Sequence, residues 1–269
     1  MGTRIIAGSQ RKVRKVFLLP NLFTAGSLFC GILAVLEIFN DNYTNACWLI
    51  LTAAVLDTCD GAIARLTRTT SDFGLNFDSL ADLVAFGVAP ALLTFGAMTG
   101  AHQMLASGVC SLYTICGALR LARFNVQAMR EERKHFLGLP VPAAALALIA
   151  LVFLYEVVPG IARYVSFTTV GPLVLVILAY LMVSKIPYAG LKNFHLLSRQ
   201  PFEILVALVG VALMLFILKK HLYIVLAVVA WTYILGGVVL FLSKSLKDVP
   251  MEHGARERVT ADGPDHGEQ

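Results

Sequence analysis

Four aspartates form two pairs at helical spacing, and they are the residues of this chain best suited to chemistry. Asp57 and Asp60 are three positions apart, and Asp78 and Asp82 are four apart, so each pair shares one face of a helix. Carboxylates that face one another repel. A bound Mg²⁺ or Mn²⁺ neutralises this repulsion, and both ions take carboxylates together with substrate phosphates as ligands. Two such ions about 3.5–4 Å apart can clamp a phosphoryl group during displacement. The pattern therefore predicts metal-assisted phosphoryl transfer.

Small residues and one arginine lie close to the four aspartates in the sequence. Glycine permits close approach of a ligand or of a second helix, and an arginine at the interface can reach an anionic group. The alternative is that Arg65 only anchors its helix at the cytoplasmic surface of the membrane. The stretch reads Asp57-x-x-Asp60-Gly61-x-x-Ala64-Arg65, then eight residues, then Gly74-x-x-x-Asp78-x-x-x-Asp82.

The elements that must position these residues are membrane helices. Of the 269 residues, 58% are apolar and 14% are charged, against roughly 25% charged in an ordinary soluble domain. The mean hydropathy is +0.75, so the apolar excess must face lipid. We predict an all-α, polytopic bundle of about eight transmembrane helices, each near the roughly 20 residues that a bilayer requires. The predicted spans are 17–39, 44–65, 78–98, 103–124, 139–158, 165–184, 202–218 and 221–243.

The distribution of Lys and Arg predicts the orientation. All of the 22 basic residues except Arg163, Lys219 and Lys220 fall in the arm, the tail, the loops or the span ends on one side of the membrane. Basic loops stay inside, so we predict that both termini are cytoplasmic and that the acids lie near the cytoplasmic face. Membrane orientation and anionic lipid explain the net charge of +5 better than nucleic acid does. We expect a basic arm over 1–15, a transmembrane domain over 16–243 and a charged, disordered tail over 244–269.

The aspartate motif resembles that of the CDP-alcohol phosphatidyltransferase family at every fixed position. The resemblance implies that the four aspartates hold two divalent ions, and that Asp82 is also the general base. It implies a homodimer, and it suggests nucleotide contacts for Asn21 and Thr24, although Asn21 can also cap or bridge helices. In the motif itself, the residues that the resemblance assigns to the CDP moiety are Gly61, Ala64, Arg65 and Gly74.

The flanking segments resemble bacterial-type phosphatidylserine synthases within that family. The resembling segments are 19–24, 78–90, 120–125 and 138–142. The resemblance implies transfer of the phosphatidyl group from CDP-diacylglycerol to the hydroxyl of L-serine, at a prokaryotic cell (inner) membrane. Arg120 and Arg123 lie at the cytoplasmic end of the fourth span. We hypothesise that one of them binds the serine carboxylate or a phosphate, while plain membrane anchoring is the alternative.

Two other functions are compatible with the sequence. A related enzyme with a different acceptor, such as glycerol 3-phosphate or inositol phosphate, would need extra basic residues, which the cluster from Arg120 to Lys134 supplies. A cation-coupled transporter would use the acids as its ion site, with broken helices near the bilayer midplane. The predicted place of the acids near one interface favours an enzyme that acts on a headgroup.

Overall fold

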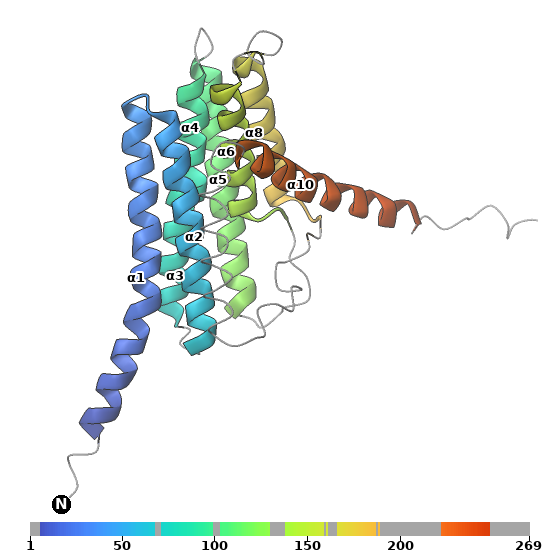
Figure 1. Cartoon of the computed structure of the whole chain (residues 1–269). Helices are drawn as coiled ribbons and strands as arrows, with labels where there is room; N and C mark the ends of the chain where they lie inside the picture. The colour runs from blue at the N-terminus through green and yellow to red at the C-terminus, as the bar shows by residue number, and fades with distance from the viewer. Residues whose placement is uncertain are drawn as a thin grey trace, which may run out of the picture.

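The computed structural model describes residues 6–67, 71–98, 103–129, 138–158, 160, 166–186, 188 and 222–247. All the regular elements in these ranges are helices, as predicted (Figure 1). They are α1 (Ile6–Phe39), α2 (Tyr43–Thr67), α3 (Asp72–Asp82), η1 (Leu83–Val88), α4 (Ala89–Ala97), α5 (Gln103–Met129), α6 (Val141–Val157), α8 (Phe167–Val183) and α10 (Leu222–Lys247).

Several helices are long and apolar enough to cross a membrane, which confirms the predicted class of protein. Within the described ranges there are five such stretches, while α6 and α8 are apolar but have only 17 residues each. The predicted span over 202–218 lies outside the described residues, as does the tail beyond 247. The number of eight spans and the side on which the termini lie stay predictions. The five stretches are Pro20–Phe39, Tyr43–Ala64, Asp72–Ala97, Gln103–Gln127 and Ile224–Phe241.

The third apolar stretch is one continuous rod that changes its winding directly after Asp82. Its first part, α3, gives way to the π-helical turn η1, and α4 follows without a break. The main-chain carbonyl of Phe86 in η1 accepts a hydrogen bond from the Tyr113 hydroxyl at 3.1 Å, and that of Gly87 accepts one from Thr114 at 3.5 Å. Both donors lie on α5, so the wide turn fixes the register between α5 and the helix that carries Asp82.

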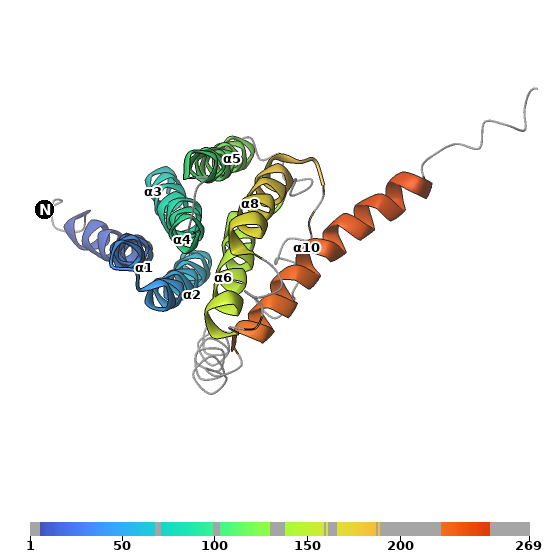
Figure 2. The ribbon, with the colours of Figure 1, turned by 90° about the horizontal axis from the view of Figure 1, so that it is seen from above.

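The helices pack around α6, which contacts α2, α4, α8 and α10. Its side chains Leu148 and Ile149 are fully buried, as expected of a helix that is apolar on all sides. On the opposite flank, α1 packs along α2 and also contacts α3, η1 and α4. Seen from above, α1, α2 and α5 are nearly end-on, whereas α10 lies along its length (Figure 2). The last helix thus crosses α6 at a steep angle.

Two glycines allow close contacts that shape the bundle. A Cβ at Gly31 of α1 would lie 2.9 Å from the Ala85 Cα of η1, so these two helices touch backbone to backbone. Gly138, before α6, has a φ of +87°, and a Cβ there would lie 2.2 Å from the carbonyl oxygen of Met182. The Gly138 N–H donates to the Ile186 carbonyl at 2.9 Å. This bond holds the segment after α8 against the start of α6.

Candidate active site

Helices α2 and α3 bring the predicted acids together. Asp57, Asp60 and Asp78 each offer a carboxylate oxygen, and these oxygens all lie within 4.8 Å of one another. Asp82 lies beside Asp57 and within electrostatic range of the other two, but it does not belong to this group of three. Its Oδ1 atom is shielded from solvent and has no hydrogen-bond partner among the described residues. The structure therefore places three aspartates as one cluster with the fourth beside it.

The donor set of this cluster fits a hard divalent cation. All three donors are carboxylate oxygens, the ligands that Mg²⁺ and Mn²⁺ take together with substrate phosphates. Asp60 is only 5% exposed, and a buried carboxylate beside two others is costly unless a positive charge is present. The residues therefore suit one ion directly, and a second ion would draw on Asp82. Occupancy by two ions stays a prediction.

Helix α1 supplies a hydroxyl that orients one of the ligands. Thr24 is 4% exposed, and its Oγ1 donates to the Asp60 Oδ2 at 2.6 Å. The same hydroxyl lies 3.2 Å from the Pro20 carbonyl of its own helix. A hydrogen bond of this kind fixes a metal ligand in one orientation. We predicted a nucleotide contact for Thr24; the structure shows a bond to Asp60, and the contact with the nucleotide stays a prediction.

Asn21 and Gly74, which the sequence places far apart, meet at the start of α3. A Cβ built at Gly74 would lie 3.5 Å from the Asn21 Oδ1 and 3.1 Å from the Ser71 Oγ. Ser71 caps α3 by accepting the Gly74 N–H at 3.0 Å, as N-cap serines do. Two of the predicted CDP-site residues are thereby side by side.

The remaining predicted CDP-site residues lie on α2, next to the acids. Gly61 directly follows Asp60, and Ala64 lies one turn beyond it. The side chain of Arg65 lies outside the part of the structure that is described. Contacts of all three with the nucleotide stay predictions.

The two arginines predicted for the acceptor have different surroundings. The Arg123 Nη1 donates to the Val183 carbonyl at 3.3 Å, where α8 ends and its last carbonyls lack helical partners. Arg120 instead lies within electrostatic range of Asp82 and of Tyr233 on α10. Its Nε atom is shielded from solvent, with no hydrogen-bond partner in the described ranges. Arg120 therefore lies near one of the aspartates, while Arg123 joins α5 to α8.

One polar contact beside the aspartates received no role from the sequence. Ser79 of α3 directly follows Asp78, and its hydroxyl lies 3.1 Å from the Asn125 Oδ1 of α5. Both residues lie in segments that resemble the family, but only the packing of α3 on α5 shows that they meet. This hydrogen bond helps to fix the helix of Asp78 and Asp82 against α5.

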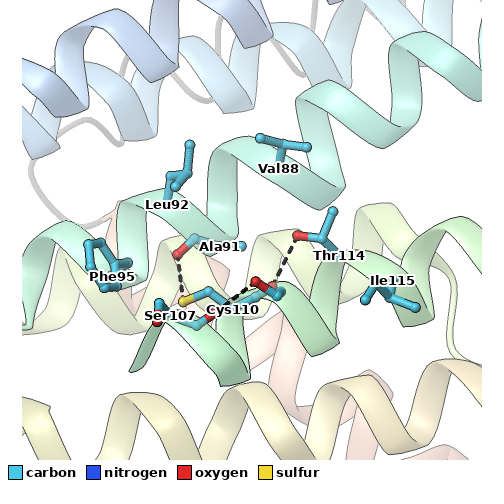
Figure 3. A pocket seen from close by; sticks show the side chains of 9 residues that line it. Val88, Ala91, Leu92, Phe95, Ser107, Cys110, Thr114 and Ile115 are labelled. Atoms are coloured by element: carbon cyan, nitrogen blue, oxygen red, sulfur yellow. Dashed lines mark hydrogen bonds between the residues drawn. The ribbon is translucent and has the colours of Figure 1, made fainter. Parts of the chain in front are cut away.

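A cavity of about 340 Å³ lies between the η1–α4 rod and α5 (Figure 3). Its polar side chains are turned to backbone: the Cys110 thiol lies 3.3 Å from the Ala91 carbonyl, and the Ser111 hydroxyl donates to the Ser107 carbonyl at 2.9 Å. No carboxylate or basic side chain lines it, so it is not a second polar site. The lining residues are Val88, Ala91, Leu92, Phe95, Ser107, Cys110, Ser111, Thr114 and Ile115.

Comparison with known proteins identifies the class. The model of the CDP-alcohol phosphatidyltransferase family matches residues 17–184, which include the four aspartates. The chain belongs to this family of membrane enzymes, as the resemblance of the motif implied.

Three curated relatives indicate the subgroup that the chain is similar to. A CDP-diacylglycerol–serine O-phosphatidyltransferase of Helicobacter pylori (strain J99) is 35% identical over 252 residues, covering 87% of this chain and 99% of the relative. The enzyme of the same name from Bacillus subtilis is 35% identical over 175 residues, covering 65% and 92%. An archaetidylserine synthase of Methanothermobacter thermautotrophicus is 37% identical over 142 residues, covering 52% and 60%.

Proposed function

We propose that this enzyme transfers the phosphatidyl group from CDP-diacylglycerol to the hydroxyl of L-serine, giving phosphatidylserine and CMP. The observation that carries the proposal is the cluster of Asp57, Asp60 and Asp78 with Asp82 beside it. This arrangement suits the displacement of a phosphoryl group at a divalent cation. The names of the relatives in Helicobacter pylori and Bacillus subtilis support serine as the acceptor.

Asp57, Asp60, Asp78 and Asp82 would hold the two divalent cations, and Thr24 would keep Asp60 turned toward them. When bound, the cations neutralise the diphosphate and the charge that develops on the departing CMP. On the proposed assignment, the cytidine end of the substrate lies along α2 and the start of α3. The residues assigned to it are Asn21, Thr24, Gly61, Ala64, Arg65 and Gly74.

Asp82 is the general base of the proposed reaction. Its carboxylate takes the proton of the serine hydroxyl while the serine oxygen attacks the lipid-side phosphorus, and the bond from that phosphorus to the CMP oxygen breaks. Its position beside the cluster and the free Oδ1 atom support this role. A group with a lone pair directed at the acceptor is the first requirement of a general base.

Arg120 is the better candidate for the serine carboxylate, because Arg123 already binds the Val183 carbonyl. The planar guanidinium fork binds a carboxylate through two hydrogen bonds, which the single ammonium of lysine cannot reproduce. We therefore expect Arg120→Lys to raise the KM for serine, and Arg123→Lys to leave it unchanged. Equal values of KM for both variants and the wild type would exclude this role for Arg120.

The proposed function is tested with purified enzyme, CDP-diacylglycerol, Mn²⁺ and labelled serine, with and without EDTA. We expect label in the lipid phase only when the metal is present, and none with the Asp57→Asn variant. Label from glycerol 3-phosphate or inositol phosphate, but not from serine, would keep the family and reject the acceptor. Absence of turnover with every alcohol would contradict the proposed reaction and favour the acids as an ion site. Because the assay uses detergent solution without a gradient, it separates an enzyme from a transporter.

We propose a homodimer in a prokaryotic cell (inner) membrane, with both termini and the active site on the cytoplasmic side. The resemblance supports the dimer, and the one-sided distribution of basic residues supports the orientation. Cross-linking in native membranes tests the dimer. Accessibility of cysteines introduced at the two termini tests the orientation.

A further inference from the structure

A second group of polar side chains begins next to Asp82. Its members come from three separate parts of the chain. Arg120 comes from α5, Tyr188 follows α8, and Tyr233 lies on α10. Tyr188 is 4% exposed, yet its hydroxyl has no hydrogen-bond partner among the residues that the structure describes, and the same holds for the Arg120 Nε. Unpaired buried donors are rare and indicate a missing partner. Within the described ranges, both donors are open to a further partner.

The members of this group follow one another away from the aspartates. Arg120 lies within electrostatic range of both Asp82 and Tyr233. The rings of Tyr233 and Tyr188 have centroids 5.7 Å apart and planes inclined by 35°. The cluster therefore runs from the proposed base, through the guanidinium, to two phenol rings.

The position of Tyr188 is fixed on two sides. A Cβ at Gly237, one turn after Tyr233, would lie 2.2 Å from the Tyr188 ring, so only glycine leaves room for the ring against α10. On the other side, the Ile186 carbonyl accepts the Gly138 N–H at 2.9 Å. The Tyr188 hydroxyl is thus held in a protein interior and does not project into solvent.

The chemistry of the group suits an anionic ligand. Guanidinium and phenol O–H groups are hydrogen-bond donors, and charge-assisted bonds to a carboxylate are among the strongest in proteins. Burial raises the pKa of Tyr188, and the neighbouring Tyr233 raises it further, so its hydroxyl keeps its proton at neutral pH. A carboxylate at this place would satisfy the unpaired donors and leave an attached hydroxyl free to approach Asp82.

We propose that Arg120, Tyr188 and Tyr233 form the pocket that holds the carboxylate of the amino-acid acceptor. This rests on the proposed function and extends it, because it makes α10 a part of the active site. The family model ends at residue 184, and both tyrosines lie beyond it. The two tyrosines therefore add to Arg120 a part of the chain outside the matched range, where a preference for one acceptor can be set.

Tyr188→Phe tests the pocket, since it removes the hydroxyl and retains the ring. A hydrogen bond to a charged group that is lost on substitution corresponds to about a tenfold effect or more. We expect the KM for serine to rise about tenfold, with kcat and the KM for CDP-diacylglycerol within about twofold of the wild type. L-alanine has the carboxylate without the hydroxyl, so its inhibition constant should rise in parallel, while that of CMP stays constant.

The matched control is Tyr180→Phe, because Tyr180 of α8 is 71% exposed whereas Tyr188 is buried. We expect wild-type constants for this variant. Tyr233→Phe is the second test and carries the decision if Tyr188→Phe does not fold. A KM for serine within twofold of the wild type in the folded tyrosine variants would overturn the pocket, while serine turnover would still support the reaction. If the wild type does not use serine at all, the proposed function itself fails.

Discussion

The hydrogen bond between Thr24 and Asp60 offers the sharpest test of how the bundle builds the proposed metal site. Thr24→Val keeps the branched shape of the side chain and removes the hydroxyl that donates to the Asp60 Oδ2 at 2.6 Å. Asp60 is buried and belongs to the aspartate cluster. Its carboxylate then loses a partner that solvent cannot readily replace.

The size of the effect follows from this geometry. A hydrogen bond to a charged group contributes about 1.5–3 kcal/mol, and loss of a partner that orients a metal ligand costs about 10–100-fold in metal affinity or activity. The bond is short and buried, so we expect an effect within this range. We predict that the Mn²⁺ concentration for half-maximal rate rises about 10–100-fold, while the rate at saturating Mn²⁺ falls less.

The assay is CMP release as a function of Mn²⁺ concentration at saturating lipid and acceptor. Thr58→Val is the matched control, since Thr58 also lies beside the acids on α2, but it is exposed and its hydroxyl binds the Ala54 carbonyl of its own helix at 2.8 Å. If the rate depends on the Mn²⁺ concentration in the same way in Thr24→Val and in the wild type, the reasoning is refuted. A raised KM for CDP-diacylglycerol with an unchanged metal curve would instead support a nucleotide contact for Thr24.

Two further predictions concern the base and the packing of the bundle. Asp82→Asn should lower kcat by about 10²–10⁴-fold, the range for loss of a general base, and a pH–rate profile with its acidic limb intact would contradict this role. Gly31→Ala should lower the melting temperature in detergent, because the new Cβ would lie 2.9 Å from the Ala85 Cα and overpacking costs about 1–3 kcal/mol. Gly108→Ala, with nothing within 4 Å of the new Cβ, should not lower it. Equal melting temperatures for the two glycine variants would show that the contact is not tight.

The acids and the class of fold were predictable because both depend on local patterns. Runs of apolar residues identify membrane helices by their length alone, and spacings of three and four residues place carboxylates on one helix face. The short connection between the second and third spans makes their helices neighbours. Asp57, Asp60 and Asp78 therefore meet as expected.

The π-helical turn after Asp82 was not predictable in the same way. A turn of this kind adds a residue to the winding, which rotates every later side chain relative to the regular period of 3.6. The turn is stabilised by hydrogen bonds from Tyr113 and Thr114 on another helix. Its sequence, Leu83–Val88, is apolar like that of α4 and carries no signal of the change.

The sequence by itself determined that this is a helical membrane protein with four aspartates at helical spacing, since composition and spacing along one chain segment suffice for that. The tertiary structure decided which polar side chains of different helices meet. Thr24 binds Asp60, which lies 36 positions later in the chain. Arg120 and Arg123 lie one helical turn apart on α5, yet Arg120 lies near Asp82 and Arg123 binds a carbonyl of α8. The physical reason is that contacts between helices depend on how each helix is rotated and crossed against its neighbours, which no single helix encodes.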